Sequence, residues 1–104
     1  MFQTQISGLT VEPGQSQLPE ISNGFDMGFG ASAKWGLGFL LHTNGIESGR
    51  SRGSVSWAGL FNSYYWIDRK QGICAVIATQ ILPFYDDDVV ELLLEFEQII
   101  YENL

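Results

Sequence analysis

The pattern of apolar and polar residues divides the chain into an irregular first third, a run of strands and a final helix. Residues 1–33 show little periodicity, and residues 10–20 carry two prolines and a glycine among polar side chains, which is typical of a loop. We therefore interpret residues 1–33 as an irregular connecting segment. Residues 34–104 are expected to form a sheet with a helix.

Four segments in the middle of the chain have the composition of strands: residues 34–42, 53–59, 64–67 and 72–80. The last two are expected to form a hairpin across the turn of residues 68–71. The final strand is almost continuously apolar, which favours burial on both of its faces. Its cysteine, Cys74, is expected to be a buried and unreactive thiol.

A helical pattern begins after Pro83. Asp86 is placed to cap a helix N-terminus, and Asp87 and Asp88 suit the positive end of the helix dipole. The apolar residues that follow recur at helical spacing: Val89, Leu92, Leu93, Phe96, Ile99 and Ile100. We predict an α+β fold in which this C-terminal amphipathic helix packs on an antiparallel sheet of about three or four strands.

Charge excludes some classes of partner. The net charge is −7, from 12 acidic and five basic residues. Residues 86–104 contain seven of the acids and no lysine or arginine, which favours a solvated, acidic helix face. A nucleic-acid partner is not expected, because phosphate binding needs a basic patch. Neither a membrane-spanning run nor a signal-peptide pattern occurs, so we expect no membrane partner and a cytoplasmic location.

Three short motifs occur in a fixed order: Trp35-Gly36-Leu37-Gly38-Phe39, Trp57-Ala58-Gly59 and Gln80-Ile81-Leu82-Pro83-Phe84. Their order and spacing resemble the C-terminal part of the β-lactamase-related serine hydrolases. This family includes class C β-lactamases, penicillin-binding proteins, family VIII esterases and fungal acyltransferases. The middle motif stands where β-lactamases carry Lys-Thr-Gly and the esterase-like branch carries Trp-Gly-Gly.

The resemblance implies one wall of an acyl-transfer site. In that family a serine attacks an ester or amide carbonyl, and two backbone N–H groups bind the resulting oxyanion. By position, the Leu60 N–H would be one donor, and Gly59 would let the substrate approach the backbone. Trp57 and Ala58 would contact the substrate. Trp57 cannot form an ion pair with a carboxylate, which implies a neutral ester or thioester as the small-molecule substrate.

The nucleophile motif of that family, Ser-x-x-Lys, does not occur in these 104 residues, because Ala31 and Ile67 precede the two lysines at the required spacing. A Tyr-x-Asn string at Tyr101-Glu102-Asn103 lies in the final helix, whereas the family places its tyrosine before the third motif. We therefore expect the C-terminal part of a serine esterase or acyltransferase, inactive alone. We expect no cofactor.

Two alternatives remain open. The chain could be a stand-alone, non-catalytic binding or interaction protein derived from the same fold. It could also be an unrelated α+β module whose aromatic side chains contact a sugar or a peptide. In the family fold, further elements cover the sheet, so this chain would expose an apolar strand edge and self-associate through it.

The remaining candidate residues have plainer interpretations. Trp35, Tyr64, Tyr65 and Trp66 are expected to be packing aromatics of the sheet, and Trp57 considered alone would be one too. His42 is expected at the surface, at a strand end. A dyad of Cys74 with His42 is disfavoured by the apolar neighbours of the cysteine. No metal site is expected, because a second histidine or cysteine is lacking.

Overall fold

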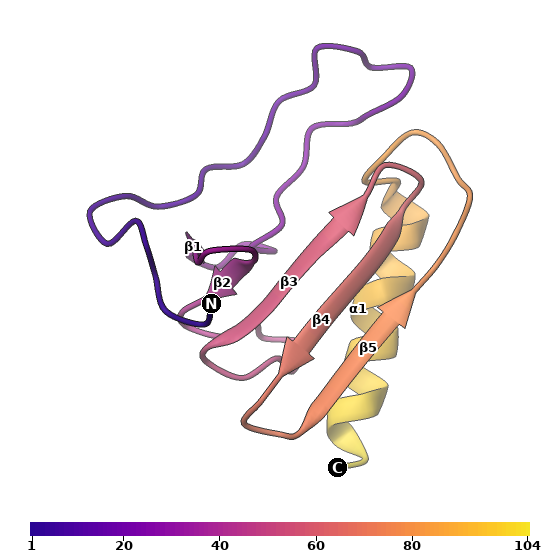
Figure 1. The fold of residues 1–104 in the computed structure, drawn as a ribbon. Helices are drawn as coiled ribbons and strands as arrows, with labels where there is room; N and C mark the ends of the chain where they lie inside the picture. Colours follow the sequence, from indigo (N-terminus) through magenta and orange to yellow (C-terminus); the bar gives the residue numbers. More distant parts are fainter.

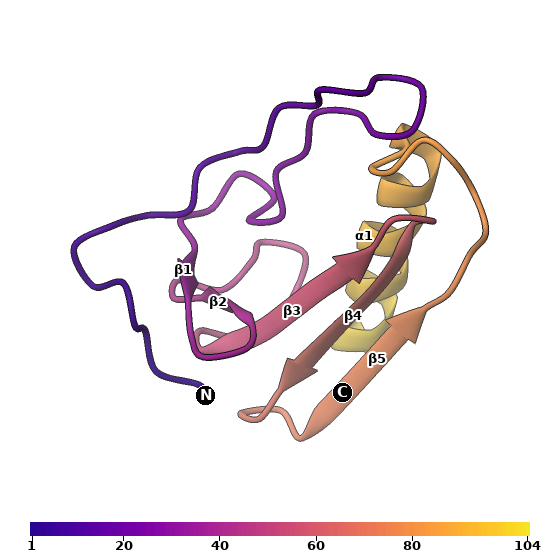
Figure 2. The same cartoon turned by 45° about the horizontal axis from the view of Figure 1, so that its top comes forward.

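One antiparallel sheet and one helix form the protein in this computed structural model, which describes residues 1–104. The strands lie in chain order across the sheet: β1 (Lys34–Trp35), β2 (Leu40–His42), β3 (Ser54–Gly59), β4 (Ser63–Asp68) and β5 (Ile73–Ile77). Helix α1 (Asp87–Glu102) packs against one face of the long strands β3 to β5 (Figure 1 and Figure 2). The predicted α+β fold is confirmed, with five strands rather than three or four.

Residues 1–33 contain no strand longer than an isolated bridge and follow an open path beside the sheet (Figure 1). Their start lies against the β1–β2 turn, because the Gln5 N–H donates to the Trp35 carbonyl at 2.8 Å. A Cβ at Gly36 would lie 2.2 Å from the Met1 carbonyl oxygen. Glycine at this position therefore allows the N-terminal residues to approach the backbone of the turn.

The extent that we predicted for the first strand is wrong. Residues 34–42 do not form one strand but two short ones, β1 and β2, which pair so that Lys34 lies opposite Leu41. The Gly36 N–H donates to the Phe39 carbonyl at 2.9 Å and closes the turn between them. The apolar run therefore folds back on itself.

Helix α1 begins where the sequence predicts. The Asp86 carboxylate accepts a hydrogen bond from the Val89 N–H at 3.1 Å, and two further aspartates occupy the first turn. The predicted apolar face is only partly buried, since Leu92 and Ile99 are 54% and 59% exposed. Glu97 is instead fully buried, which corrects its assignment to the solvated acidic face.

The pairing of the long strands puts every second residue on the face of the sheet that α1 covers. Ser56, Trp66 and Ala75 lie opposite one another across β3, β4 and β5, and Trp66 belongs to the core together with Val89 and Leu93 of the helix. The core consists of Met27, Ala33, Leu40, Tyr64, Trp66, Val89 and Leu93.

The outer face of β5 is uncovered, contrary to the expectation of burial on both faces. Cys74 is exposed rather than buried, and Val76 is 68% exposed. The chain supplies a helix to only one side of the sheet, and residues 1–33 run from the β1–β2 turn to the segment before α1 (Figure 2). The single helix is neither long nor apolar enough to cross a membrane.

Candidate active-site strand

The residues of the predicted acyl-transfer wall gather at one end of the sheet. Trp57, Ala58 and Gly59 are the last three residues of β3, and Leu60 begins the turn into β4. Gly59 pairs with Ser63, which is the final rung of the β3–β4 ladder. Trp57 and Leu60 are 37% and 47% exposed. This end of the strand is therefore open to a ligand.

Two features of the backbone here suit a reacting carbonyl group. The Leu60 N–H donates to no acceptor in the chain. A Cβ added at Gly59 would meet only the Ser63 Cβ, at 3.9 Å, and Gly59 does not have a positive φ. The fold itself thus does not require glycine at this position, and the space beside its backbone is free.

Trp57 has both a packing contact and an exposed surface. Its ring meets the Trp35 ring edge to face, with centroids 4.8 Å apart and an interplanar angle of 88°. Such pairs hold each other in a defined orientation beyond their contribution to buried area. Trp57 therefore acts as a sheet aromatic on one side and leaves an apolar surface on the other.

Asn62 holds this turn in place, and the sequence analysis missed it. Its backbone is left-handed, with φ of 62°, and its side chain is fully buried. The side-chain N–H₂ donates to the carbonyls of Ile81 and Pro83, both at 2.8 Å. Its oxygen accepts from the Tyr64 hydroxyl at 2.8 Å and from the Asp86 N–H at 3.0 Å.

Three of these four bonds join the β3–β4 turn to the segment that leads into α1, and the fourth joins it to Tyr64 of β4. A second connection lies beside them, because the Ile81 N–H donates to the Phe61 carbonyl at 3.2 Å and the Thr79 hydroxyl donates to the Asn62 carbonyl at 3.0 Å. The turn that carries Leu60 is therefore fixed by several hydrogen bonds, most of them half-buried. Asparagine is a common turn residue that tolerates positive φ, which was the one available sequence signal.

His42 is fully buried, which corrects its expected surface position. Strand β2 lies inside the sheet, so its end is covered although a polar loop follows. The His42 Nε2 lies 2.7 Å from the Ser56 Oγ and 3.3 Å from Arg50 Nη1. Burial, together with the positive charge of Arg50, lowers the pKa of His42 to about 3. The imidazole is therefore neutral at physiological pH.

The charge of Arg50 is balanced by Glu97. Arg50 Nε lies 3.0 Å from Glu97 Oε2, and the Arg50 backbone N–H donates to Oε1 at 3.0 Å. The guanidinium also stacks over the rings of Phe29 and Trp66, at 5.3 and 4.7 Å. Burial lowers the pKa of Arg50, and the nearby Glu97 carboxylate opposes that shift. This cluster connects the loop before β3 to α1.

Tyr101, from the Tyr-x-Asn string, also connects helix and sheet. Its hydroxyl donates to Asp68 Oδ2 at 2.7 Å and accepts from Trp66 Nε1 at 3.2 Å. Burial alone would raise the pKa of Asp68, but hydrogen bonds from Ser51, Tyr101 and Gln71 hold it below its usual value. Tyr101 has a structural contact here and does not lie at the β3 end.

The fold does not bring together the side chains of a Cys-His dyad or of a metal site. Cys74 and His42 lie on β5 and β2, with two strands between them. No group of three His, Cys, Asp or Glu side chains is placed to hold a metal ion.

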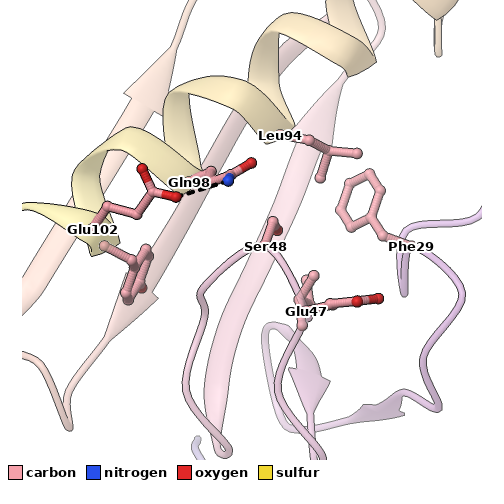
Figure 3. Close-up of a pocket in the computed structure, with 8 residues that line it drawn as sticks. Phe29, Glu47, Ser48, Leu94, Gln98 and Glu102 are labelled. Atoms are coloured by element: carbon pink, nitrogen blue, oxygen red, sulfur yellow. Dashed lines mark hydrogen bonds between the residues drawn. The ribbon is translucent and has the colours of Figure 1, made fainter.

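A groove of about 630 Å³ lies between α1 and the loop before β3. Leu94 and Gln98 of α1 form one wall, and Phe29, Glu47 and Ser48 lie across from them (Figure 3). None of the predicted site residues lines this groove.

Comparison with known proteins shows the family of this chain. A sequence profile of the Beta-lactamase family matches residues 6–98, so the chain belongs to the beta-lactamase family. The suspected relationship is therefore confirmed. The match also includes most of the irregular first third. No curated protein matches the chain.

Similar solved structures come from simvastatin synthase (LovD) of Aspergillus terreus. The LovD6 mutant matches with a TM-score of 0.68 at 28% sequence identity. The unliganded selenomethionyl derivative and the LovD9 mutant match with a TM-score of 0.67, at 28% and 29% identity. Each match covers 70% of this chain and 19% of the other chain, so this chain spans about a fifth of the length of these structures.

Proposed function

We propose that this chain contributes one wall of the active site of a serine esterase or acyltransferase, with the Leu60 N–H as an oxyanion donor. The observation that carries the proposal is that the Leu60 N–H has no hydrogen-bond partner in the chain and stands next to Gly59, beside whose backbone there is free space. Family membership and the similarity to a synthase support acyl-transfer chemistry on a small molecule.

The chemistry needs a donor where charge develops. When a serine oxygen adds to the ester carbonyl, the C–O bond forms, the carbonyl π electrons move to oxygen, and a tetrahedral oxyanion results. Collapse of this intermediate restores the carbonyl and expels the alcohol or thiol. A donor already fixed in the folded chain lowers the barrier, because it does not reorganise during the reaction. The bonds of Asn62 fix the turn that carries the Leu60 N–H.

Trp57 sets the expected substrate class. Its exposed surface is apolar and carries no charge that could bind a substrate carboxylate. We therefore propose neutral esters or thioesters as substrates and expect poor hydrolysis of penicillins. Ala58 and Gly59 are small and leave the strand accessible.

The nucleophile must come from residues outside this chain, because no Ser-x-x-Lys occurs within it. The chain alone is therefore proposed to be inactive. The same absence favours a second candidate, a non-catalytic interaction protein that retained this half of the fold.

A chimeric enzyme tests the proposal. The matching segment of simvastatin synthase would be replaced by the corresponding segment of this chain, and acyl transfer would be measured. Gly59→Val should reduce the acylation rate at least tenfold by blocking approach to the backbone, whereas Ala78→Val, which adds bulk at another exposed position, should not. Equal activity of the Gly59→Val chimera and its parent would remove the proposed role and favour the interaction protein.

A further inference from the structure

The two carbonyls that follow Leu60 in the chain share one donor, the hydroxyl of Thr79. Thr79 lies two residues after β5, and its hydroxyl contacts the Phe61 carbonyl and, at 3.0 Å, the Asn62 carbonyl. The hydroxyl has one proton, which these two oxygens share. The Phe61 carbonyl also accepts from the Ile81 N–H at 3.2 Å. Two donors from the segment after β5 therefore hold the carbonyl of the residue next to Leu60.

The backbone of Thr79 is bound to the same turn. Ser63 begins β4, and its Oγ donates to the Thr79 carbonyl at 3.3 Å. The Thr79 N–H donates back to the Ser63 Oγ at 3.4 Å. Ser63 is also the residue that pairs with Gly59 at the end of the β3–β4 ladder. Thr79 is therefore joined to residues 61–63 through both its backbone and its side chain, which fixes the position of its hydroxyl.

Glycine at position 59 makes such a restraint useful. The Leu60 N–H belongs to the peptide group between Gly59 and Leu60, and no acceptor in the chain holds that N–H. Because glycine has no Cβ, its φ and ψ are less restricted, so this peptide group rotates more easily than one after another residue. A rotated peptide would direct the Gly59 carbonyl, instead of the Leu60 N–H, at the substrate oxygen. Fixing the Phe61 carbonyl opposes this rotation, because the next part of the turn cannot move to compensate.

We propose that Thr79 is a positioning residue for acyl transfer, whose hydroxyl keeps the Leu60 N–H directed at the developing oxyanion. This inference rests on the proposed function. Thr79 acts through the turn and not by touching the substrate. Its contribution should appear in the acylation rate and not in substrate binding, because the negative charge on the oxygen develops only as the serine adds. Thr79 is half-buried, so loss of its hydroxyl should leave the fold intact.

Thr79→Val in the chimeric enzyme tests the inference, because valine has nearly the shape of threonine but no hydroxyl. The acylation rate at saturating neutral thioester, measured by rapid quench, should fall about tenfold, less than the loss expected when the donor itself is removed. The KM should stay unchanged. Thr79→Ser keeps the hydroxyl and should restore the rate. Thr43→Val, at a half-buried threonine in the loop after β2, is the matched control and should not slow acylation. Circular dichroism checks that each variant is folded.

A second replacement separates this inference from the function on which it rests. Exchanging the Leu60 amide for an ester removes its N–H, so Thr79→Val should cause no further loss of rate in that background. A slow Leu60 ester with a Thr79→Val rate equal to that of the parent would overturn the inference and leave the proposed function standing. A full further loss in the ester background would also overturn the inference, because Thr79 would then act by another route. An unchanged rate for the Leu60 ester would overturn the proposed function, and the inference with it.

Discussion

Arg50 donates from Nε to Glu97 at 3.0 Å, and the two side chains are only 1% and 0% exposed. The pair joins the loop that precedes β3 to the last turns of α1. Glu97 also accepts the Arg50 backbone N–H, so a single carboxylate satisfies both a side chain and a buried backbone donor. The stability of the sheet-and-helix layer therefore depends on a charge in its interior.

Glu97→Gln should lower the free energy of unfolding by about 3–5 kcal/mol, because it leaves the buried guanidinium without a counter-charge. Urea unfolding followed by circular dichroism measures this change. Glu91→Gln, at an exposed position of the same helix, is the matched control. If Glu97→Gln unfolds the chain outright, the double variant Arg50→Met with Glu97→Gln should restore a folded state, because it removes the unpaired charge and keeps an acceptor for the Arg50 backbone N–H. Equal stability of Glu97→Gln and Glu91→Gln would contradict the buried-pair account.

Acid should destabilise the fold through His42. Its folded-state pKa of about 3 lies below the ordinary value of 6.5, so the unfolded chain binds more protons between these two pH values. The free energy of unfolding should therefore fall as the pH falls from 6.5 towards 3, by up to about 1.4 kcal/mol per pH unit from this group. Urea titrations at several pH values should show a shallower slope for His42→Gln. An identical slope in both proteins would show that His42 is not responsible.

Asn62→Ala should be strongly destabilising, since it removes hydrogen bonds from the carbonyls of Ile81 and Pro83 and from the Asp86 N–H. Each group left unpaired costs about 1 kcal/mol, the lower end of the range for buried groups, because all three bonds are half-buried. Thermal unfolding of Asn62→Ala and of Asn44→Ala, at an exposed loop position, measures the difference. A melting temperature equal to that of Asn44→Ala would exclude Asn62 as the anchor of the turn.

The chain alone should not react as a serine hydrolase. A fluorophosphonate probe should not label it, and p-nitrophenyl butyrate should not be hydrolysed above the buffer rate. The reason is that no lysine lies three residues after a serine, so no serine has the base that this family uses. Intact-mass spectrometry after incubation with the probe gives the answer. Stoichiometric labelling of a serine would contradict the proposed inactivity.

The elements with strong local signals could be predicted from the sequence. The Asp86 cap and the apolar spacing that follows it placed α1, and the turn after Asp68 placed the β4–β5 hairpin. Local patterns were less informative for residues 34–42, because the turn within them contacts the N-terminal residues, where the Gln5 N–H donates to the Trp35 carbonyl.

The burial of polar groups could not be predicted for the same reason. Glu97 has acidic neighbours and looks like part of a solvated face, and only the tertiary position of Arg50 explains its burial. His42 is followed by a polar loop, but its strand lies inside the sheet. Cys74 lies in an apolar run, yet its side of the sheet is uncovered. Each outcome depends on what packs against the residue.

The candidate site was located from the resemblance of a short motif to a known family, and not from the pattern of apolar and polar residues. Trp57 and Gly59 are two residues apart in the sequence, so their proximity needed no structure. The role of Asn62 depends on residues about twenty positions later and became visible only in the fold. The proposed oxyanion donor is a backbone group, and no residue type marks such a group in a sequence.

The most direct test of the central claim replaces the Leu60 amide by an ester in the chimeric enzyme. This change removes the N–H and leaves the side chain and the neighbouring residues as they are. The acylation rate, measured by rapid quench with a neutral thioester, should fall about 10²–10³-fold, as expected for loss of one oxyanion donor. The same replacement at Ala78 should have no such effect. An unchanged acylation rate for the Leu60 ester would contradict the assignment of this strand.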